Sequence, residues 1–261
     1  MNRRQLVDLM AAGRPALGTF VNLGSPLAAE ACALGGASWL LLDLEHGTGE
    51  HALLPQILAA EAHGVAALVR VETADRIRAG RVLDLGVTGV MFPRIDTVEQ
   101  AAEAIAHLRY PPEGDRGVAT YNRACGFGLD TGALDRANGE VLGIIQIESP
   151  EAVANAAEIA AVPGVDVLFV GPRDLSHAMG IPGQVRHPDF VAAMEHVLAA
   201  AGKAGIAAGT LAATPASAAG YVADGFTFVG VGSDSSILAG AVADAIRTTT
   251  DAATRLQKEV S

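Results

Sequence analysis

Lysine, cysteine and aromatic residues are scarce in this sequence of 261 residues, and no stretch of it is strongly basic. The two cysteines, Cys32 and Cys125, form no CxxC pair, which argues against a disulfide framework and fits a reducing cytoplasm. The net charge is −11, and Lys and Arg do not cluster. Nucleic acid is therefore disfavoured as a partner, because phosphate binding needs such clusters.

Long hydrophobic runs are also missing. No segment reaches the length of a membrane span without a charge, a glycine or a proline. The amino-terminal stretch MNRRQLVDLMAAG carries two arginines, and Asp8 interrupts the apolar core that a signal peptide requires. The sequence therefore predicts no membrane partner and a cytoplasmic location.

Hydrophobic residues make up half of the chain, enough to fill the core of a single domain over residues 1–261. Short apolar runs recur, each followed by a polar or glycine-containing break and then by a helical pattern. Most runs are continuous, which is typical of parallel strands covered on both faces. We expect strands at residues 16–21, 39–43, 66–71, 89–92, 142–147, 167–170, 207–211 and 226–230.

Amphipathic patterns between these runs predict helices, and Thr97 and Ser149 are good helix starts. Eight strands that alternate with helices over about 250 residues favour an α/β fold of the (β/α)8 TIM-barrel type. A doubly wound sheet is the alternative, but no GxGxxG follows the first strand. The expected helices include residues 28–34, 50–63, 98–108, 151–159 and 189–204, with an apolar, alanine-rich last helix at 237–246.

One connection, residues 109–138, is much longer than the others. It contains the runs YPP, RG and CGFG. A long loop of this kind in a compact domain is often functional, and a subunit contact is the alternative.

Polar side chains gather where the predicted strands end, which is the face that carries the chemistry of such barrels. The turns at the opposite end are plainer and contain mostly glycine. The polar strand ends hold Asp43, Glu45 and His46 after the second strand, Arg70 after the third, Arg94 after the fourth, Gln146 and Glu148 after the fifth, and Gly171, Pro172, Arg173 and Asp174 after the sixth.

Glu148 and Asp174 close neighbouring strands. Two carboxylates without His or Cys between them suit a hard divalent cation, with water and substrate in the remaining positions. The alternative is that each carboxylate pairs with a nearby arginine.

His46 is a candidate general base, because a free imidazole titrates near neutral pH, and Asp43 could orient it. Arg70 could clamp a carboxylate or a developing oxyanion. The alternative for Arg70 is a salt bridge to Glu72 or Asp43.

Five stretches of the sequence, in order, resemble the HpcH/HpaI aldolases, the metal-dependent pyruvate aldolases related to 4-hydroxy-2-oxoheptanedioate aldolase. The stretches are GTFVNLGSPLAAEACALGGASWLLLDLEHG, GVMFPRIDTVEQA, RYPPEGDRGVA, QIES and VDVLFVGPRDLSHAMGIPGQVRHP. The resemblance implies a barrel of the phosphoenolpyruvate/pyruvate type. It also implies a homohexamer, a trimer of dimers whose last helices are exchanged between subunits.

Carried over position by position, the resemblance places the metal ligands on Glu148 and Asp174 and the base on His46, supported by Asp43. It places the oxyanion-stabilising arginine on Arg70. The backbone amides around Arg173 and Asp174 would hold the pyruvate carboxylate, and we count Gln146, Gly171 and Pro172 with this substrate cradle. After Arg116-Gly117 the match becomes loose in a loop that shapes the acceptor side of the pocket in the family, where Arg123 still fits the pattern.

Aldol chemistry on pyruvate requires an enolate stabilised by a lysine Schiff base or by a Lewis-acid metal. The only lysines are Lys203, at the end of a predicted helix, and Lys258, in the tail. Neither closes a strand, so a divalent cation such as Mg, Mn or Co is expected. Phe20 and Leu211, near the ends of the first and seventh strands, are candidates for the wall of the aldehyde pocket.

The expected reaction joins or separates an aldehyde and the enolate of pyruvate or hydroxypyruvate, with 4-hydroxy-2-oxo acids as substrates. A related acyl-CoA lyase of the citryl- or malyl-CoA type is an alternative, although no basic patch is available for the CoA phosphates. A binding homologue without catalysis is the second alternative.

Overall fold

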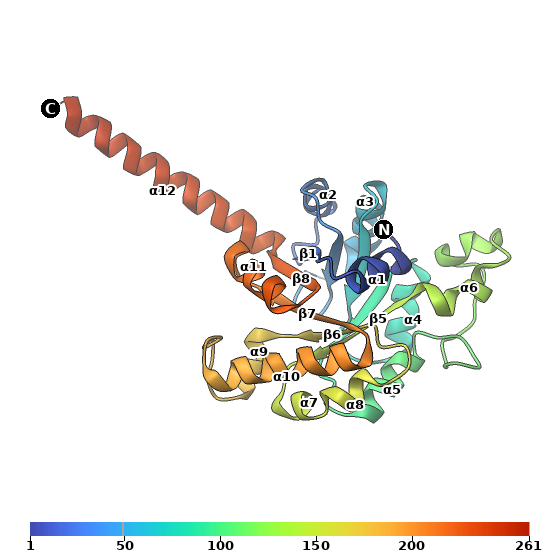
Figure 1. Ribbon diagram of the computed structural model, residues 1–261. Helices are drawn as coiled ribbons and strands as arrows, with labels where there is room; N and C mark the ends of the chain where they lie inside the picture. The colour runs from blue at the N-terminus through green and yellow to red at the C-terminus, as the bar shows by residue number, and fades with distance from the viewer. Residues whose placement is uncertain (49, 261) are drawn as a thin grey trace.

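Eight parallel strands close into a barrel in the computed structural model, which describes residues 1–48 and 50–260 (Figure 1). Each strand pairs with its neighbours in the sequence, and β1 also pairs with β8. The expected (β/α)8 TIM-barrel fold is thereby confirmed. The strands are β1 (Ala16–Val21), β2 (Trp39–Asp43), β3 (Ala66–Arg70), β4 (Gly89–Phe92), β5 (Leu142–Ile147), β6 (Val167–Val170), β7 (Ala207–Ala212) and β8 (Phe228–Ser233).

The eighth strand departs most from the sequence-based expectation, because it begins at Phe228 and not at Phe226. Phe226 follows Gly225, which ends helix α11 (Pro215–Asp224) with a left-handed φ of 110°. The Phe226 ring then packs edge-on against Tyr221 of that helix. Its apolar character thus serves helix packing and not strand pairing.

Both faces of the strands are buried, which explains the continuous apolar runs. Inward-pointing side chains form one core, in which the rings of Trp39 and Phe228 stack with centroids 4.3 Å apart. Outward-pointing side chains form a second, larger core between the strands and the helices.

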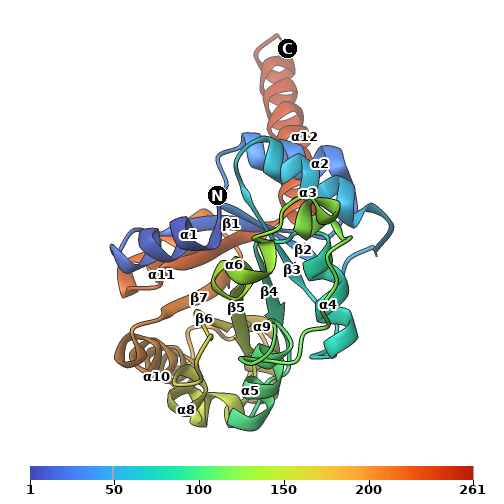
Figure 2. The same ribbon diagram turned by 90° about the vertical axis from the view of Figure 1, so that its right-hand side faces the viewer.

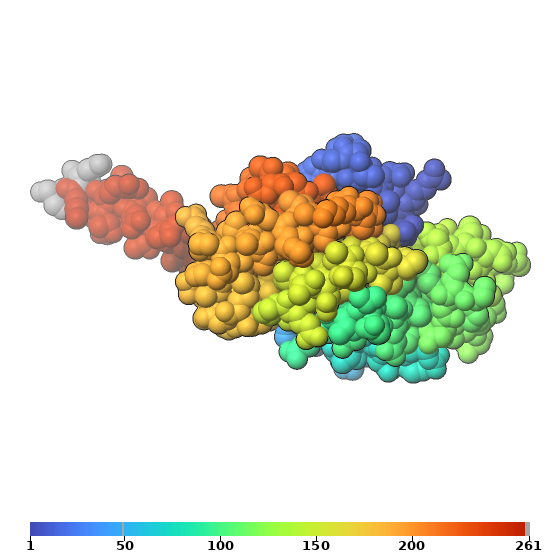
Figure 3. All heavy atoms as spheres, turned by 60° about the horizontal axis from the view of Figure 1, so that its bottom comes forward, coloured from blue at the N-terminus to red at the C-terminus, as the bar shows by residue number. Residues whose placement is uncertain are grey.

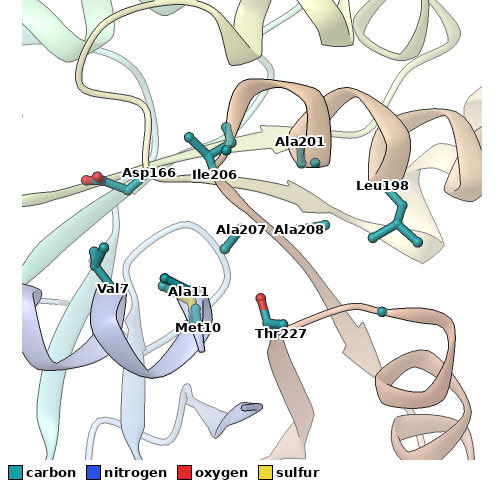
Figure 4. A pocket seen from close by; sticks show the side chains of 13 residues that line it. Val7, Met10, Ala11, Asp166, Leu198, Ala201, Ile206, Ala207, Ala208 and Thr227 are labelled. Atoms are coloured by element: carbon teal, nitrogen blue, oxygen red, sulfur yellow. The ribbon is translucent and has the colours of Figure 1, made fainter. Parts of the chain in front are cut away.

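Helix α1 (Arg3–Ala11) closes the amino-terminal end of the barrel (Figure 2). It begins at a capping box between Asn2 and Gln5, and its Leu6 and Met10 join the inner core. A pocket of about 350 Å³ remains between this helix and the start of β7 (Figure 4).

The outer helices follow the expected pattern with one break. Thr97 and Ser149 cap helices as expected, but the helix predicted at 151–159 is divided at Asn155, whose side-chain amide donates to the carbonyl of Asp96 at 2.8 Å. These helices are α2 (Pro26–Leu34), α3 (Leu53–Ala62), α4 (Arg76–Asp84), α5 (Val98–Ala106), α7 (Pro150–Ala154), α8 (Ala156–Ala160), α9 (Pro172–Ala178) and α10 (Pro188–Ala204). In Figure 3, α10 (orange) lies beside α8 (yellow) on one side of the barrel.

The long connection between α5 and β5 has structure of its own, namely the 3-10 helix η2 (Arg123–Gly128) and helix α6 (Ala133–Glu140). A shorter 3-10 turn, η1 (Glu50–Ala52), precedes α3. The connection leads from the end of α5 to the start of β5, so it lies at the amino-terminal end of the barrel.

The last helix, α12 (Asp234–Val260), is much longer than the predicted segment 237–246 and projects away from the barrel (Figure 1). Its side chains at Ile237, Leu238, Val242 and Ile246 are each at least half exposed. In the described parts of the chain, no helix is both long and apolar enough to cross a membrane.

Candidate active site

The uppermost inward positions of β2, β3 and β5 carry polar residues. Two residues before each of them, Leu41, Leu68 and Ile144 belong to the inner core. Because side chains alternate along a strand, Asp43, Arg70 and Gln146 also point inward, at the carboxyl end of the barrel. These three buried polar residues form the floor of the candidate site: Asp43, Arg70 and Gln146.

Arg70 is held by the protein on several sides. Its Nε donates to Asp43 Oδ1 at 2.9 Å, and its Nη2 donates to Asp43 Oδ2 at 2.6 Å. Its Nη1 lies 3.0 Å from Glu45 Oε2 and 3.5 Å from Gln146 Oε1. Burial acts to lower the pKa of Arg70, but the hydrogen bonds and charge of Asp43 outweigh it and raise this pKa. Arg70 is therefore a fixed, permanent cation in the site.

Phe20 lies beneath this cation. The Arg70 guanidinium carbon is 5.2 Å from the centre of the Phe20 ring, within the range of a cation–π contact. Phe20 in turn packs against Phe169 of β6, with ring centres 5.9 Å apart. Leu211 of β7 is half-buried against the same inner core. Both candidates for the aldehyde wall thus lie at the top of the inner core, and Phe20 also supports Arg70.

Asp43 and His46 interact through the backbone. Asp43 Oδ1 accepts the backbone N–H groups of Glu45 at 3.1 Å and His46 at 3.3 Å. The His46 imidazole is 64% exposed, and its Nε2 lies 3.9 Å from Glu45 Oε2. Both carboxylate oxygens of Asp43 also accept hydrogen bonds from Arg70. Asp43 thus connects Arg70 to the backbone of the loop that carries His46.

Glu148 accepts hydrogen bonds at both carboxylate oxygens. The backbone N–H of Arg94 donates to Oε1 at 2.7 Å, and Gln146 Nε2 donates to Oε2 at 2.6 Å. Arg94 adopts a left-handed φ of 56°, a strained conformation that often marks a functional site in a non-glycine residue. Burial raises the pKa of Glu148, and the charges of Asp174 and Glu45 act in the same direction.

Gly171 permits the side chains of Gln146 and Glu148 to lie close to the turn after β6. A Cβ atom at this position would lie 2.8 Å from Gln146 Nε2 and 3.3 Å from Glu148 Oε2. Pro172 then starts α9, and Asp174 stands in its first turn with an exposed side chain. Arg173 beside it is also exposed.

The donor set fits a hard divalent cation better than a softer one. Glu148 and Asp174 provide only oxygen atoms. Burial and, to a smaller extent, the charge of Asp174 raise the pKa of Glu148, and a bound cation would counteract both effects. Within residues 1–48 and 50–260, no three His, Cys, Asp or Glu side chains lie close enough to bind a metal. A cation held by these two carboxylates would therefore complete its coordination with substrate and water.

Two site residues lacked a role in the sequence analysis. Glu45 was visible in the polar end of the second strand, but its ion pair with Arg70 depends on the side-chain arrangement. Arg94 contributes its backbone N–H through a left-handed conformation that no sequence signal announces.

Arg123 and its loop lie away from this site. Arg123 Nη1 donates to the carbonyl of Leu85 at 2.6 Å, and its Nη2 pairs with Glu61. Leu85 and Glu61 end the helices that lead into β4 and β3, at the amino-terminal side of the barrel. Within one chain, Arg123 and its contacts therefore lie away from the strand-end site.

Comparison with known proteins identifies relatives across almost the whole barrel. The family model described as HpcH/HpaI aldolase/citrate lyase matches residues 16–241. A 5-keto-4-deoxy-D-glucarate aldolase of Klebsiella pneumoniae is 41% identical over 226 residues, which cover 86% of this chain and 88% of that one. An aldolase of the same name from Salmonella arizonae is equally similar, with the same coverage.

Solved structures show the same architecture. A crystal structure of an HpcH/HpaI aldolase/citrate lyase family protein from Burkholderia cenocepacia superposes with a TM-score of 0.91 and 38% identity, covering 94% of this chain and 99% of that one. The citrate synthase SbnG superposes with a TM-score of 0.85 and 26% identity, covering 95% and 98% of the two chains.

Proposed function

This chain belongs to the HpcH/HpaI aldolase/citrate lyase family, and we propose that it joins or separates an aldehyde and the enolate of pyruvate or of a close analogue such as hydroxypyruvate. As an aldolase it is a carbon–carbon lyase. The observation that carries the proposal is a buried, permanently charged Arg70 beside the carboxylate of Glu148, at the carboxyl end of the barrel.

We take 4-hydroxy-2-oxo acids as the substrate class. The compound in the relatives' name, 5-keto-4-deoxy-D-glucarate, is such an acid when it is numbered from its keto end. Its ketone adjoins a terminal carboxylate, and a deoxygenated carbon and then a hydroxyl-bearing carbon follow. Cleavage between those two carbons yields pyruvate and an aldehyde, so the substrate of this chain is proposed to carry the same pattern.

His46 is proposed to remove the proton from the C4 hydroxyl, through a water molecule. Its exposed imidazole at the mouth of the barrel is free to meet such a water. Arg70 stabilises the charge that develops on the enolate oxygen, because Asp43 and Glu45 hold its guanidinium in place before the reaction begins.

The rest of the substrate would lie between the fifth, sixth and first strands. The backbone amides around Arg173 and Asp174 hold the pyruvate carboxylate, with Gln146, Gly171 and Pro172 forming the cradle around them. Phe20 and Leu211 form the apolar wall on the aldehyde side.

Glu148 and Asp174 are proposed to hold a divalent cation, Mg, Mn or Co. When bound, such a cation supplies Lewis-acid polarisation of the ketone oxygen. The alternative, a Schiff base, requires a lysine at a strand end. Lys203 stands in the last turn of α10, which leads into the amino end of β7, and Lys258 lies far along α12.

We further propose a cytoplasmic homohexamer in which α12 is exchanged between subunits. An apolar groove of about 630 Å³ runs between α12 and α2 and is lined by side chains such as Leu17, Ala31, Ile237 and Leu238. Exposed apolar surface of this kind commonly marks a protein interface. A neighbouring copy of the chain would cover it.

The reaction class is tested with a panel of aldehydes, each incubated with pyruvate or hydroxypyruvate, with and without added Mg²⁺, Mn²⁺ or Co²⁺. Metal-dependent formation of a 4-hydroxy-2-oxo acid, measured by chromatography, is expected. Turnover of citryl-CoA or malyl-CoA without any aldol product would instead favour an acyl-CoA lyase. No turnover under any condition would favour a non-catalytic binding protein.

A further inference from the structure

We propose that a second pocket, at the amino-terminal end of the barrel, binds a small oxyanion such as a phosphate or a dicarboxylate. This pocket has a volume of about 560 Å³ and lies between α6, the ends of the long connection and the chain before β4. Its lining includes Gly86 to Thr88, directly before β4, and Gly139 to Val141, directly before β5. It is therefore separate from the strand-end site and does not depend on the function proposed above.

Arg116 provides the first unpartnered donor at this pocket. The residue is only 3% exposed, and its Nη2 donates to Asp84 Oδ1 at 3.0 Å. Its Nε has no hydrogen-bond partner among the described residues and almost no contact with solvent. A buried donor without an acceptor destabilises the folded protein. A ligand oxygen that accepts from this Nε would remove that free-energy penalty.

Tyr110 provides the second unpartnered donor at this pocket. Its ring lies under the Arg116 guanidinium, with the guanidinium carbon 4.5 Å from the ring centre. In the part of the chain that the structure describes, its hydroxyl also has no hydrogen-bond partner. Burial raises the pKa of Tyr110, so this hydroxyl is protonated and available as a donor. Both residues line the pocket, where the oxygen atoms of one bound oxyanion would accept from these donors.

The charge around the pocket also favours an anion. Its lining residues with ionisable charges are Arg3, Arg4, Arg116, Arg136 and Glu140, in a chain of net charge −11. Each arginine has a carboxylate neighbour, for example Asp130 at 2.6 Å from Arg136. A guanidinium has five donors, however, so these pairs leave donors free for a ligand.

The proposal is tested by calorimetry and thermal unfolding of the full-length protein with inorganic phosphate and, separately, with succinate. We expect saturable binding of at least one of them together with a higher melting temperature, and the preferred probe identifies the anion class. Tyr110→Phe removes only the hydroxyl and keeps the ring under Arg116. It should raise the Kd of the anion about three- to tenfold without lowering the melting temperature of the ligand-free protein.

Two control variants localise the binding. Tyr221→Phe alters a half-buried tyrosine on α11 and should leave anion binding unchanged. Arg136→Gln at the pocket should weaken binding, whereas Arg247→Gln on α12, an exposed arginine with a similar ion pair, should not.

Three results overturn the proposal. One is the lack of saturable binding of either anion, and another is binding that Tyr110→Phe and Arg136→Gln leave unchanged. The third is a lower melting temperature of ligand-free Tyr110→Phe, which would mean that the hydroxyl already has a partner.

Discussion

Gly171 decides how closely the residues of the candidate site can approach one another. Its backbone conformation suits any residue, so the requirement for glycine is steric. A side chain there would meet the amide of Gln146 and the carboxylate of Glu148, which are hydrogen-bonded to each other. The position therefore links the turn after β6 to the proposed metal ligand on β5.

Gly171→Ala should lower aldol turnover by up to about a hundredfold, because displacement of a reacting group by about 1 Å can have an effect of that size. Steady-state kinetics with pyruvate and an aldehyde measure the change. Gly202→Ala is the matched control, since a Cβ atom at Gly202 in α10 meets nothing within 4 Å. That variant should keep full activity, and equal losses in both would contradict the steric account.

His46→Ala should reduce turnover by about 10²–10⁴-fold, the usual contribution of a positioned general base. Metal affinity, measured by calorimetry, should stay near that of the wild type, because the proposed ligands lie on other strands. His51→Ala alters an exposed histidine a few residues later and should have little effect. Loss of the metal from His46→Ala would make His46 a ligand and not a base.

At the scale of single residues, the sequence predicted which residue types form the site better than it predicted their contacts. The polar ends of the strands were all visible, and Arg70, Gln146 and Glu148 do converge. The partner of Asp43 was not decided by sequence, because Arg70 and His46 stand equally near in the predicted arrangement. The left-handed conformation of Arg94 follows from the tertiary structure and leaves no local signal.

At the scale of elements, strands with two buried faces were the easiest to predict. Their continuous apolar runs end where the pairing ends, and five of them have the expected bounds. The predicted bounds were wrong where an apolar residue packs against a helix, or where a side chain within a helical pattern bonds to another part of the chain. Phe226 packs on α11, and Asn155 divides a helix by bonding to the carbonyl of Asp96.

Helix α12 is the element on which the proposed hexamer depends. Val242→Glu places a charge on its exposed apolar face and should shift the oligomer toward smaller species, because burial of that charge in an interface is unfavourable. Light scattering coupled to size exclusion measures the mass. Thr249→Glu, at an exposed polar position on the same helix, is the control. A wild-type monomer at micromolar concentration would rule out the proposed hexamer.

At the scale of the whole molecule, the two ends of the barrel are chemically different. The carboxyl end gathers Asp43, Arg70, Glu148 and Asp174 around one mouth, as expected for this fold. The amino-terminal end is closed by α1 and carries the arginine-lined pocket beside α6. Sequence located the first end through strand periodicity, whereas the second is assembled from distant segments that share no local pattern.

The most direct test of the proposed chemistry is the release of pyruvate from 5-keto-4-deoxy-D-glucarate by enzyme that has been exhaustively chelated and then supplied with Mg²⁺, Mn²⁺ or Co²⁺. The metal-free enzyme should release none, and addition of a metal should restore release in the wild type but not in Glu148→Gln. Glu151→Gln, at an exposed position in the next helix, should respond like the wild type. Undiminished release by the chelated enzyme, or trapping of pyruvate on Lys203 by borohydride, would contradict the metal-dependent mechanism.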